Sequence, residues 1–211
     1  MMILALEFSS ERRSVALARN GIVLSEAVEQ TGGRGTNALG LIEKVLADAN
    51  VLREEVEGVV IGLGPGSYTG IRAAIAVAQG WQLARDVELL GVSSAEAIAS
   101  LAQAEQIFGR VNVVIDAQRG EFYLAAWEIS PDGRREISPL KIVAGIVVES
   151  LKSTGEICVG PEQESQLFPA AAWVARLAAG RADFVAGEKL EPIYLRETNF
   201  VKIRPPNSLR A

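Results

Sequence analysis

Histidine is absent from all 211 residues of this chain. Imidazole is the usual general base near neutral pH and a common ligand of zinc and iron, so its absence has direct consequences. Serine–histidine–aspartate hydrolysis, cysteine–histidine hydrolysis and histidine-ligated metal sites are all excluded. A metallopeptidase of the histidine-ligated kind is excluded with them.

Cysteine is nearly absent as well. The single Cys158 cannot form an internal disulfide, and its apolar neighbours Ile157 and Val159 indicate a buried, inert thiol. Long apolar runs are also missing, because Asp, Glu and Arg interrupt most apolar stretches and no basic N-terminal region precedes one. The sequence predicts a soluble, cytoplasmic protein with no membrane segment and no signal peptide.

Positive charge is in deficit, with 21 Lys and Arg against 26 Asp and Glu and a net charge of −5. A domain that binds nucleic acid by itself usually carries a basic face, so such a primary role is not expected. The C-terminal tail is an exception, since Lys202, Arg204 and Arg210 follow the last acid, Glu197. With 49% hydrophobic residues, the chain can bury one large core or two small ones.

Alternating strand and helix patterns divide the chain into two halves. The first half predicts strands over 3–8, 14–19, 22–30, 58–63 and 89–92, a tight turn at Asn20-Gly21, and helices over 36–50 (with Thr36 as N-cap), 71–85 and 95–104. The second half predicts strands over 111–116, 122–129, 135–143 and 156–159, and helices over 144–153 and 170–179. We therefore expect an α/β protein with lobes at 1–105 and 106–211 and a boundary near 103–110.

The two halves open in the same way. A largely apolar strand ends in one acid, at Glu7 and at Asp116, and then turns through arginine into an antiparallel strand. Such a repeat is typical of duplicated actin-like folds, in which a cleft between the halves holds a nucleotide and paired acids manage metal and water. Two unrelated hairpins in one α/β protein remain the alternative.

The densest group of glycines follows the strand predicted over 58–63. This glycine loop contains Gly62, Gly64, Pro65, Gly66, Ser67, Thr69, Gly70 and Arg72. Closely spaced glycines let backbone N–H groups converge, and a following helix adds its positive dipole end, so the loop is a candidate anion or nucleotide contact. The loop lacks the Lys-Ser/Thr ending of a P-loop. A tight strand-to-helix turn without a ligand is an equally good interpretation.

The helix predicted over 71–85 is apolar over about two thirds of its circumference, roughly twice what one sheet can cover. Its small residues would let a second helix approach closely. We expect a partner interface formed by Leu39, Glu43, Leu46, Ala73, Ala76, Val77, Gly80, Leu83 and Ala84. Internal cover from the alanine-rich helix near Ala175 is the alternative.

The glycine loop, Gly62-Leu63-Gly64-Pro65-Gly66-Ser67-Tyr68-Thr69-Gly70-Ile71-Arg72, resembles the signature of the TsaB (YeaZ) family. Two further runs agree with that family: Asp116-Ala117-Gln118-Arg119-Gly120-Glu121 and Pro192-Ile193-Tyr194-Leu195-Arg196. The resemblance covers the whole chain in order. Two positions depart from the family pattern, since Glu7-Phe8-Ser9 stands for its usual Asp-Thr-Ser and Arg34-Gly35 stands where it often has a histidine.

The resemblance implies a duplicated actin-like ATPase (ASKHA) fold with two lobes. It also implies a non-catalytic scaffold and dimerisation subunit of the complex that transfers threonylcarbamoyl to N6 of the adenosine next to the anticodon in tRNA. The expected partners are the catalytic subunit TsaD and the ATPase TsaE, with a homodimer when the chain is alone and only indirect contact with tRNA.

No catalytic residue, metal or resident cofactor is expected from this resemblance, and Glu7 and Asp116 would be vestigial acids. An ATP or ADP site at the partner interface is left open. The alternative function is that of an actin-like ATPase or phosphotransferase that uses Glu7, Asp116 and the glycine loop.

Overall fold

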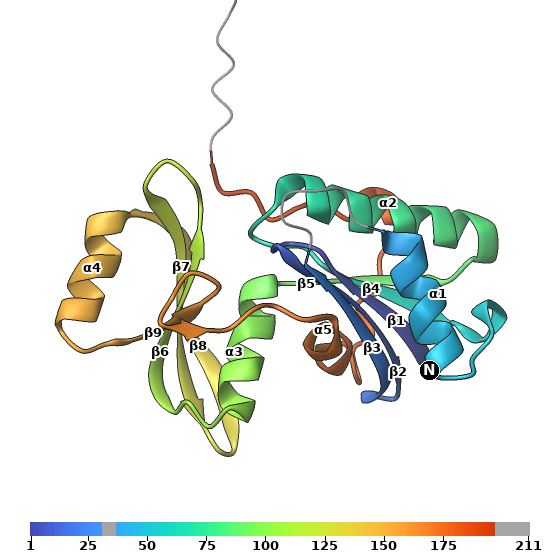
Figure 1. The fold of residues 1–211 in the computed structure, drawn as a ribbon, viewed down its shortest axis with the longest axis horizontal. Helices are drawn as coiled ribbons and strands as arrows, with labels where there is room; N and C mark the ends of the chain where they lie inside the picture. Colours follow the sequence, from blue (N-terminus) through green and yellow to red (C-terminus); the bar gives the residue numbers. More distant parts are fainter. Residues whose placement is uncertain (31–36, 197–211) are drawn as a thin grey trace, which may run out of the picture.

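The chain folds into two lobes, each built on a five-stranded mixed sheet (Figure 1). The computed structural model describes residues 1–30 and 37–196. The predicted N-cap Thr36 and the basic tail with Lys202, Arg204 and Arg210 lie outside these residues. None of the helices in the described ranges combines the length and the apolar character that crossing a bilayer requires.

The first sheet has the strand order β3-β2-β1-β4-β5. Its strands are β1 (Met2–Glu7), β2 (Arg12–Arg19), β3 (Ile22–Gln30), β4 (Gly58–Gly62) and β5 (Glu88–Val92). β1 pairs antiparallel with β2 and parallel with β4, so it lies at the centre of the sheet and all of its residues are buried. The predicted tight turn at Asn20-Gly21 joins β2 to β3, with φ angles of 51° and 81°.

Helices cover both faces of the first sheet. α1 (Ala38–Asp48) and α2 (Tyr68–Arg85) pack on the face that carries Leu4. α5 (Ala171–Leu177) packs on the opposite face, which carries Ala5. The alternative in which the alanine-rich helix near Ala175 covers α2 is therefore wrong, because the sheet separates the two helices.

Side chains cap both helices of the first face. Asn37 Oδ1 accepts a hydrogen bond from Gly40 N at 3.1 Å and fixes the start of α1. α2 begins at Tyr68, three residues earlier than predicted, and Ser67 is its N-cap. The 3₁₀ turn η1 (Arg53–Glu55) leads from α1 to β4.

The second sheet has the strand order β10-β9-β6-β7-β8. Its strands are β6 (Gly109–Asp116), β7 (Glu121–Ser130), β8 (Gly133–Ala144), β9 (Ile157–Gly160) and β10 (Ser165–Gln166). α3 (Ser94–Ala104) packs on one face, beside Val113, and α4 (Gly145–Ser153) packs on the other, beside Val114. Adjacent residues of β6 thus serve two separate clusters, as strand alternation requires.

The second sheet repeats the topology of the first. In each sheet the central strand pairs antiparallel with the next strand and parallel with a later one: β1 with β2 and β4, and β6 with β7 and β9. The two central strands end in Glu7 and Asp116 and lie in different sheets. The duplicated actin-like fold predicted from the sequence is confirmed, and two unrelated hairpins are excluded.

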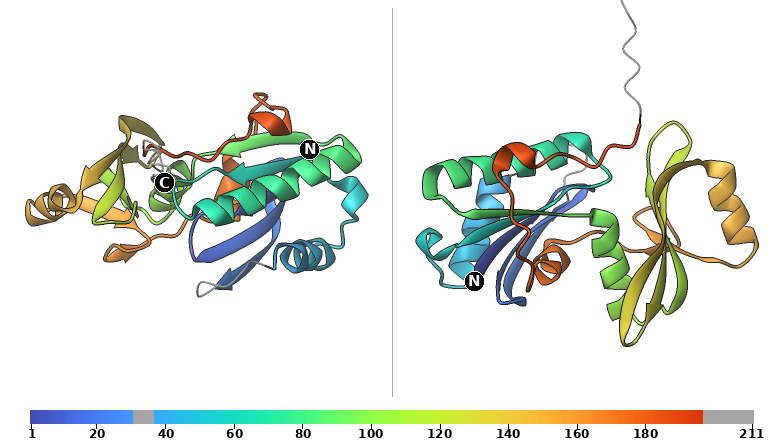
Figure 2. Two further views of the ribbon diagram at one scale, coloured as in Figure 1. Left: turned by 90° about the horizontal axis from the view of Figure 1, so that it is seen from above. Right: turned by 180° about the vertical axis from the view of Figure 1, so that it is seen from behind.

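After the second sheet the chain returns to the first lobe. Ala171 N at the start of α5 donates to Ser14 Oγ of β2 at 2.8 Å, and Val185 pairs with Leu89 of β5. The 3₁₀ turn η2 (Gly187–Lys189) lies beside α2 (Figure 2). Residues 171–190 therefore belong to the first lobe and not to the predicted lobe 106–211, because their apolar side chains cover a face of the first sheet.

Candidate functional site

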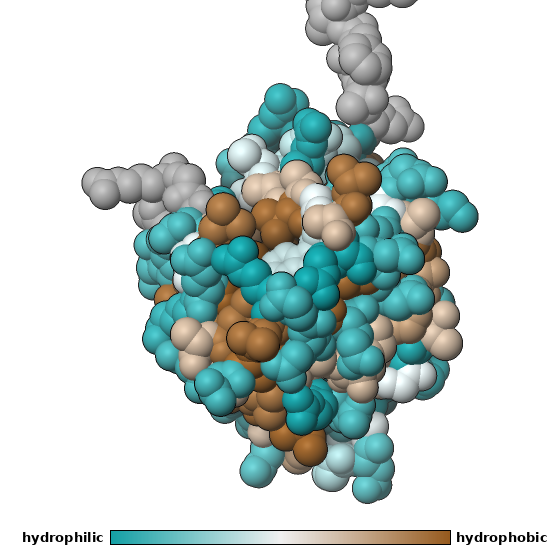
Figure 3. All heavy atoms as spheres, turned by 90° about the vertical axis from the view of Figure 1, so that its right-hand side faces the viewer, coloured by the Kyte–Doolittle hydropathy of each residue, from teal (hydrophilic) through white to brown (hydrophobic). Residues whose placement is uncertain are grey.

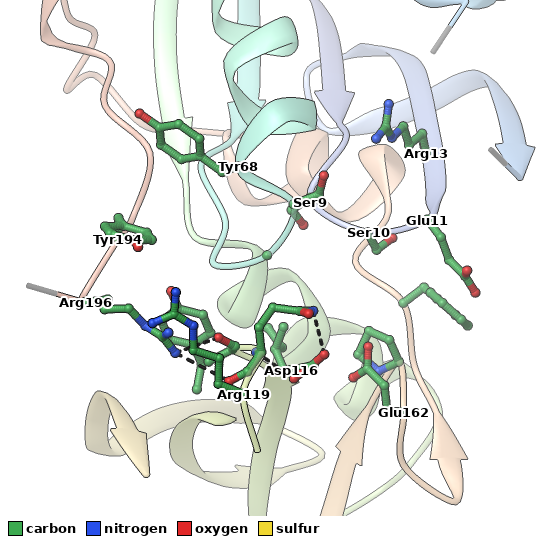
Figure 4. Close-up of a pocket in the computed structure, with 18 residues that line it drawn as sticks. Ser9, Ser10, Glu11, Arg13, Tyr68, Asp116, Arg119, Glu162, Tyr194 and Arg196 are labelled. Carbon is green, nitrogen blue, oxygen red and sulfur yellow. Dashed lines mark hydrogen bonds between the residues drawn. The ribbon is translucent and has the colours of Figure 1, made fainter. Parts of the chain in front are cut away.

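A cleft of about 780 Å³ opens between the two lobes (Figure 4). Turns that follow the central strands line it from both sides, with Ser9 and Ser10 from the first lobe and Asp116 and Arg119 from the second. Ligands of α/β proteins commonly bind outside the carboxyl ends of the strands. The cleft is therefore the candidate site, and its side chains decide what chemistry it can support.

Glu7 does not line this cleft. Its side chain is completely buried, and its carboxylate accepts hydrogen bonds from Ser9 N and from Ser94 Oγ, both at 2.7 Å. Burial raises the pKa of the Glu7 carboxyl, and the hydrogen bonds from Ser9 and Ser94 lower it by less. The Ser94 hydroxyl also accepts from Gly64 N at 3.0 Å. Glu7 thus joins β1 to the glycine loop and to the start of α3.

Asp116 lines the cleft, but both of its carboxylate oxygens are engaged. Oδ1 accepts from Gln118 N at 2.8 Å and Oδ2 accepts from Gln118 Nε2 at 2.7 Å (Figure 4). Gln118 and Arg119 have φ angles of 66° and 61°. The hydrogen bonds that Asp116 accepts from Gln118, two residues later in the chain, can stabilise this left-handed conformation. The acid of each half therefore binds the backbone N–H of its own first turn.

Close packing accounts for three glycines of the glycine loop. A Cβ added to any of them would overlap the first strand or its turn. It would lie 1.9 Å from Glu7 Oε2 if added to Gly62, 2.1 Å from Ser9 O if added to Gly66, and 2.1 Å from Phe8 O if added to Gly70. Ser67 N donates to Ser9 O at 2.6 Å, and Ser67 Oγ accepts from Gly70 N at 3.4 Å. These observations favour the tight strand-to-helix turn over the anion contact.

The other polar residues of the glycine loop point elsewhere. Thr69 and Arg72 are exposed on the first turns of α2, and the Arg72 guanidinium lies over the Tyr68 ring at 5.7 Å. The Tyr68 ring in turn contacts the Tyr194 ring, with centroids 5.9 Å apart. Tyr68 and Tyr194, unlike Arg72, line the cleft.

Several charged residues of the cleft have no counterpart among the predicted site residues. Burial raises the pKa of the Glu162 carboxyl. Two hydrogen bonds from the backbone lower this pKa, and the nearby carboxylates of Asp116 and Glu11 raise it. Arg196 also lines the cleft and forms an ion pair with Glu121. Only tertiary structure brings these groups together, although Arg196 does belong to a family motif. Across residues 1–30 and 37–196, no three His, Cys, Asp or Glu side chains are grouped to hold a metal.

A second candidate site is the outer surface of α1 and α2. Most of the predicted partner residues are exposed there: Leu39, Glu43, Ala73, Ala76, Gly80, Leu83 and Ala84. Leu46 and Val77 require a correction, because both pack into the core between these helices and the first sheet. Figure 3, which faces the end of the molecule formed by the first lobe, shows apolar residues gathered in patches between hydrophilic ones.

Comparisons with known proteins agree with the fold. A family model described as TsaD, tRNA N6-adenosine threonylcarbamoyltransferase, matches residues 33–139. A protein of Escherichia coli K12 named tRNA threonylcarbamoyladenosine biosynthesis protein TsaB is 31% identical over 63% of this chain and 58% of its own length. The protein of the same name from Bacillus subtilis is 28% identical over 61% of this chain and 56% of its own. The chain thus spans little more than half the length of these relatives.

Two solved structures from Pseudomonas aeruginosa are similar over nearly the whole chain. YeaZ has a TM-score of 0.74, and a protein described as similar to peptidase YEAZ has a TM-score of 0.78. Each is 27% identical to this chain, and each alignment covers 92% of this chain and 99% of the other.

Glu7→Gln should gain stability over the wild type as pH rises. Burial raises the folded-state pKa of Glu7 above its unfolded value, so the carboxyl stabilises the fold below the unfolded pKa and this contribution is lost as pH rises through the folded pKa. Urea denaturation from about pH 4 to about pH 8 would measure the free energy of unfolding. Glu128→Gln, at an exposed position of β7, is the matched control. A stability difference that is constant with pH would contradict the raised pKa.

Gly62→Ala should destabilise the first lobe by about 1–3 kcal/mol, because the added Cβ would overlap Glu7 Oε2. Gly133→Ala is the control, since an added Cβ there meets nothing within 4 Å. Its free energy of unfolding should stay within about 0.5 kcal/mol of the wild type. Equal stability of the two variants would show that the glycine loop tolerates side chains and is not fixed by packing.

Proposed function

We propose that this chain, which belongs to the TsaD family of tRNA N6-adenosine threonylcarbamoyltransferases and within it to the TsaB (YeaZ) group, is a non-catalytic subunit of the machinery that makes threonylcarbamoyladenosine in tRNA. Its role is to bind and support TsaD, the catalytic subunit that transfers threonylcarbamoyl to N6 of the adenosine next to the anticodon. The names of the curated relatives support the pathway.

The exposed face of α2 is the observation that carries this proposal. Ala73, Ala76 and Gly80 recur at helical spacing along it, and an added Cβ at Gly80 would meet nothing within 4 Å. Side chains this small leave the backbone of α2 accessible, so that a partner helix can pack at the short end of the usual interaxial range, about 8 Å. Leu83, which is 91% exposed, lies farther along the same face and supplies apolar area for burial.

The first turn of α1 extends the same surface, with Leu39 66% exposed. Glu43 is exposed one turn later and forms an ion pair with Arg53. A helical surface of this kind suits the equivalent helices of TsaD, or a second copy of this chain when TsaD is absent. The ATPase TsaE joins this assembly in our proposal, and the partner contact is the candidate site for ATP or ADP. We assign the chain only indirect contact with tRNA because of its net charge of −5.

The acids of the two first turns support a non-catalytic role. Glu7 is enclosed by Ser9 and Ser94, and Asp116 is held through both oxygens by Gln118. Glu7 is enclosed away from the cleft, and each oxygen of Asp116 already accepts a hydrogen bond, which leaves that acid fewer acceptor sites for a metal or a water. The alternative function as an ATPase or phosphotransferase is therefore less well supported than a scaffold.

Gly80→Arg and Ala76→Arg should each weaken binding to TsaD by at least about a hundredfold, because a charge at the centre of a helical interface is buried without a partner. Isothermal titration calorimetry with purified TsaD would measure this loss, and circular dichroism should stay unchanged because both positions are exposed. Ser150→Arg, on the exposed side of α4 in the other lobe, is the matched control. Wild-type affinity of both folded α2 variants would place the interface elsewhere.

The isolated chain should hydrolyse ATP no faster than its Asp116→Ala variant, because Glu7 does not line the cleft and Asp116 is held by hydrogen bonds within its own turn. A steady-state phosphate-release assay with magnesium and ATP tests this expectation. Hydrolysis by the wild type that disappears in a folded Asp116→Ala protein would contradict the scaffold role and favour the ATPase.

A further inference from the structure

Residues 187–196 form a strap that runs along the first lobe and ends on the second (Figure 2). Its beginning is fixed to α2, where Gln79 Nε2 donates to Gly187 O at 2.8 Å and Gly187 N donates to Gln82 Oε1 at 2.9 Å. Farther along, Ile193 N donates to Leu63 O, at the end of β4, at 2.8 Å. Two sets of hydrogen bonds therefore fasten the strap to the first lobe.

The end of the strap binds the second lobe through Arg196. Its Nη2 lies 2.6 Å from Glu121 Oε2 and 2.8 Å from Ala117 O, with a longer contact of 3.4 Å to Gln118 O. The Arg196 side chain is 21% exposed and that of Glu121 is 44% exposed, so solvent screens the ion pair mainly from the glutamate side. In the strap as the structure describes it, every side-chain hydrogen bond to the second sheet or its turns comes from Arg196.

The chain also connects the lobes through α3, which lies between them, and through residues 167–170, which lead from β10 to α5 (Figure 1). Ile98 packs on the second sheet, Ala97 packs on the cluster of the first lobe that contains α5, and Ser94 binds the glycine loop. The strap crosses from lobe to lobe above α3 in the view of Figure 1. The strap is thus a third connection between the lobes, beside α3 and residues 167–170, and its Tyr194 and Arg196 line the cleft.

We infer that the strap is a latch that limits opening of the cleft, and that the contacts of Arg196 with Glu121 and the Ala117 carbonyl are its fastening. From Ile193 to Arg196 the chain advances three residues, which reach at most about 10 Å when fully extended. Movement of the second lobe away from Leu63 therefore soon exhausts this length. Wider opening requires Arg196 to leave the second lobe or Ile193 to leave the first.

The turn between β6 and β7 is built to receive the latch. Gln118, Arg119 and Gly120 all have positive φ, between 61° and 75°, and the turn presents the carbonyls of Ala117 and Gln118 to Arg196. Asp116 holds this turn through its two hydrogen bonds to Gln118. Asp116 is therefore a positioning residue for the latch, which gives the second vestigial acid a structural use.

Distance measurements between the lobes test the latch directly. Spin labels on Ala47→Cys in α1 and Ser150→Cys in α4, both exposed, report the separation of the lobes in the full chain with Cys158→Ala. Arg196→Gln and Glu121→Gln remove the ion pair from either side. Arg53→Gln is the matched control, because it removes an exposed arginine–glutamate pair that lies within the first lobe.

Double electron–electron resonance should show longer and broader distances in Arg196→Gln and Glu121→Gln than in the wild type and in Arg53→Gln. Asp116→Ala should shift the distribution in the same direction, because its turn no longer holds the carbonyls in place. Wild-type distributions in both folded ion-pair variants would overturn the latch. Loss of folding in Arg196→Gln would leave Glu121→Gln to decide, and an unchanged distribution in that variant overturns the proposal as well.

Discussion

The buried carboxylate of Glu7 fixes the arrangement of the first lobe. It accepts hydrogen bonds from its own turn at Ser9 and from Ser94, and Ser94 accepts from Gly64. An acid enclosed in this way is stable only when its partners are in place, because an unsatisfied buried carboxyl is costly. One group therefore sets the positions of three segments that are distant in sequence: the end of β1, the glycine loop and the beginning of α3. α3 is also a helix on which both lobes pack, so the relative placement of the lobes depends on the same carboxylate.

The second lobe uses the same device with a different result. Asp116 binds Gln118 N as Glu7 binds Ser9 N, two residues on in each case. Aspartate is one methylene shorter and stays within its own turn, whereas Glu7 extends to a serine 87 residues away. The first acid thus organises the interior of a lobe, and the second organises a surface turn that receives Arg196. Duplicated topology has been kept while the two acids have taken different structural tasks.

Local patterns explain which features were predictable from the sequence. Apolar runs, turn residues and the repeated acid predicted every strand of the two sheets except the two-residue β10. The Asn20-Gly21 turn was predictable because asparagine and glycine readily adopt positive φ angles, which the structure shows at both residues. The return of α5 to the first sheet did not follow, because an alanine-rich helix looks the same whichever sheet it covers. Val77 was misplaced for a related reason: a helix that is apolar over most of its surface does not reveal which side meets the sheet. Leu46 is different, because it belongs with Ile42 and Val45 to the buried stripe of α1, and this spacing could have placed it in the core. The contacts of Glu7 with Ser94 and of Arg196 with Glu121 join distant residues, and no spacing rule anticipates them.

The glycine loop is the motif that identifies the family in the sequence, yet close packing is what requires its glycines. Gly62, Gly66 and Gly70 each lie where a Cβ would strike β1 or its turn. The loop that they permit ends in Ser67, which caps α2 and is itself held by the carbonyl of Ser9. The direction of α2, and with it the exposed face that contains Ala76 and Gly80, is therefore set by contacts beneath the loop. The need to hold α2 in a fixed position is enough to account for the glycine loop. The loop by itself is therefore no evidence for the nucleotide chemistry of actin-like folds in this chain.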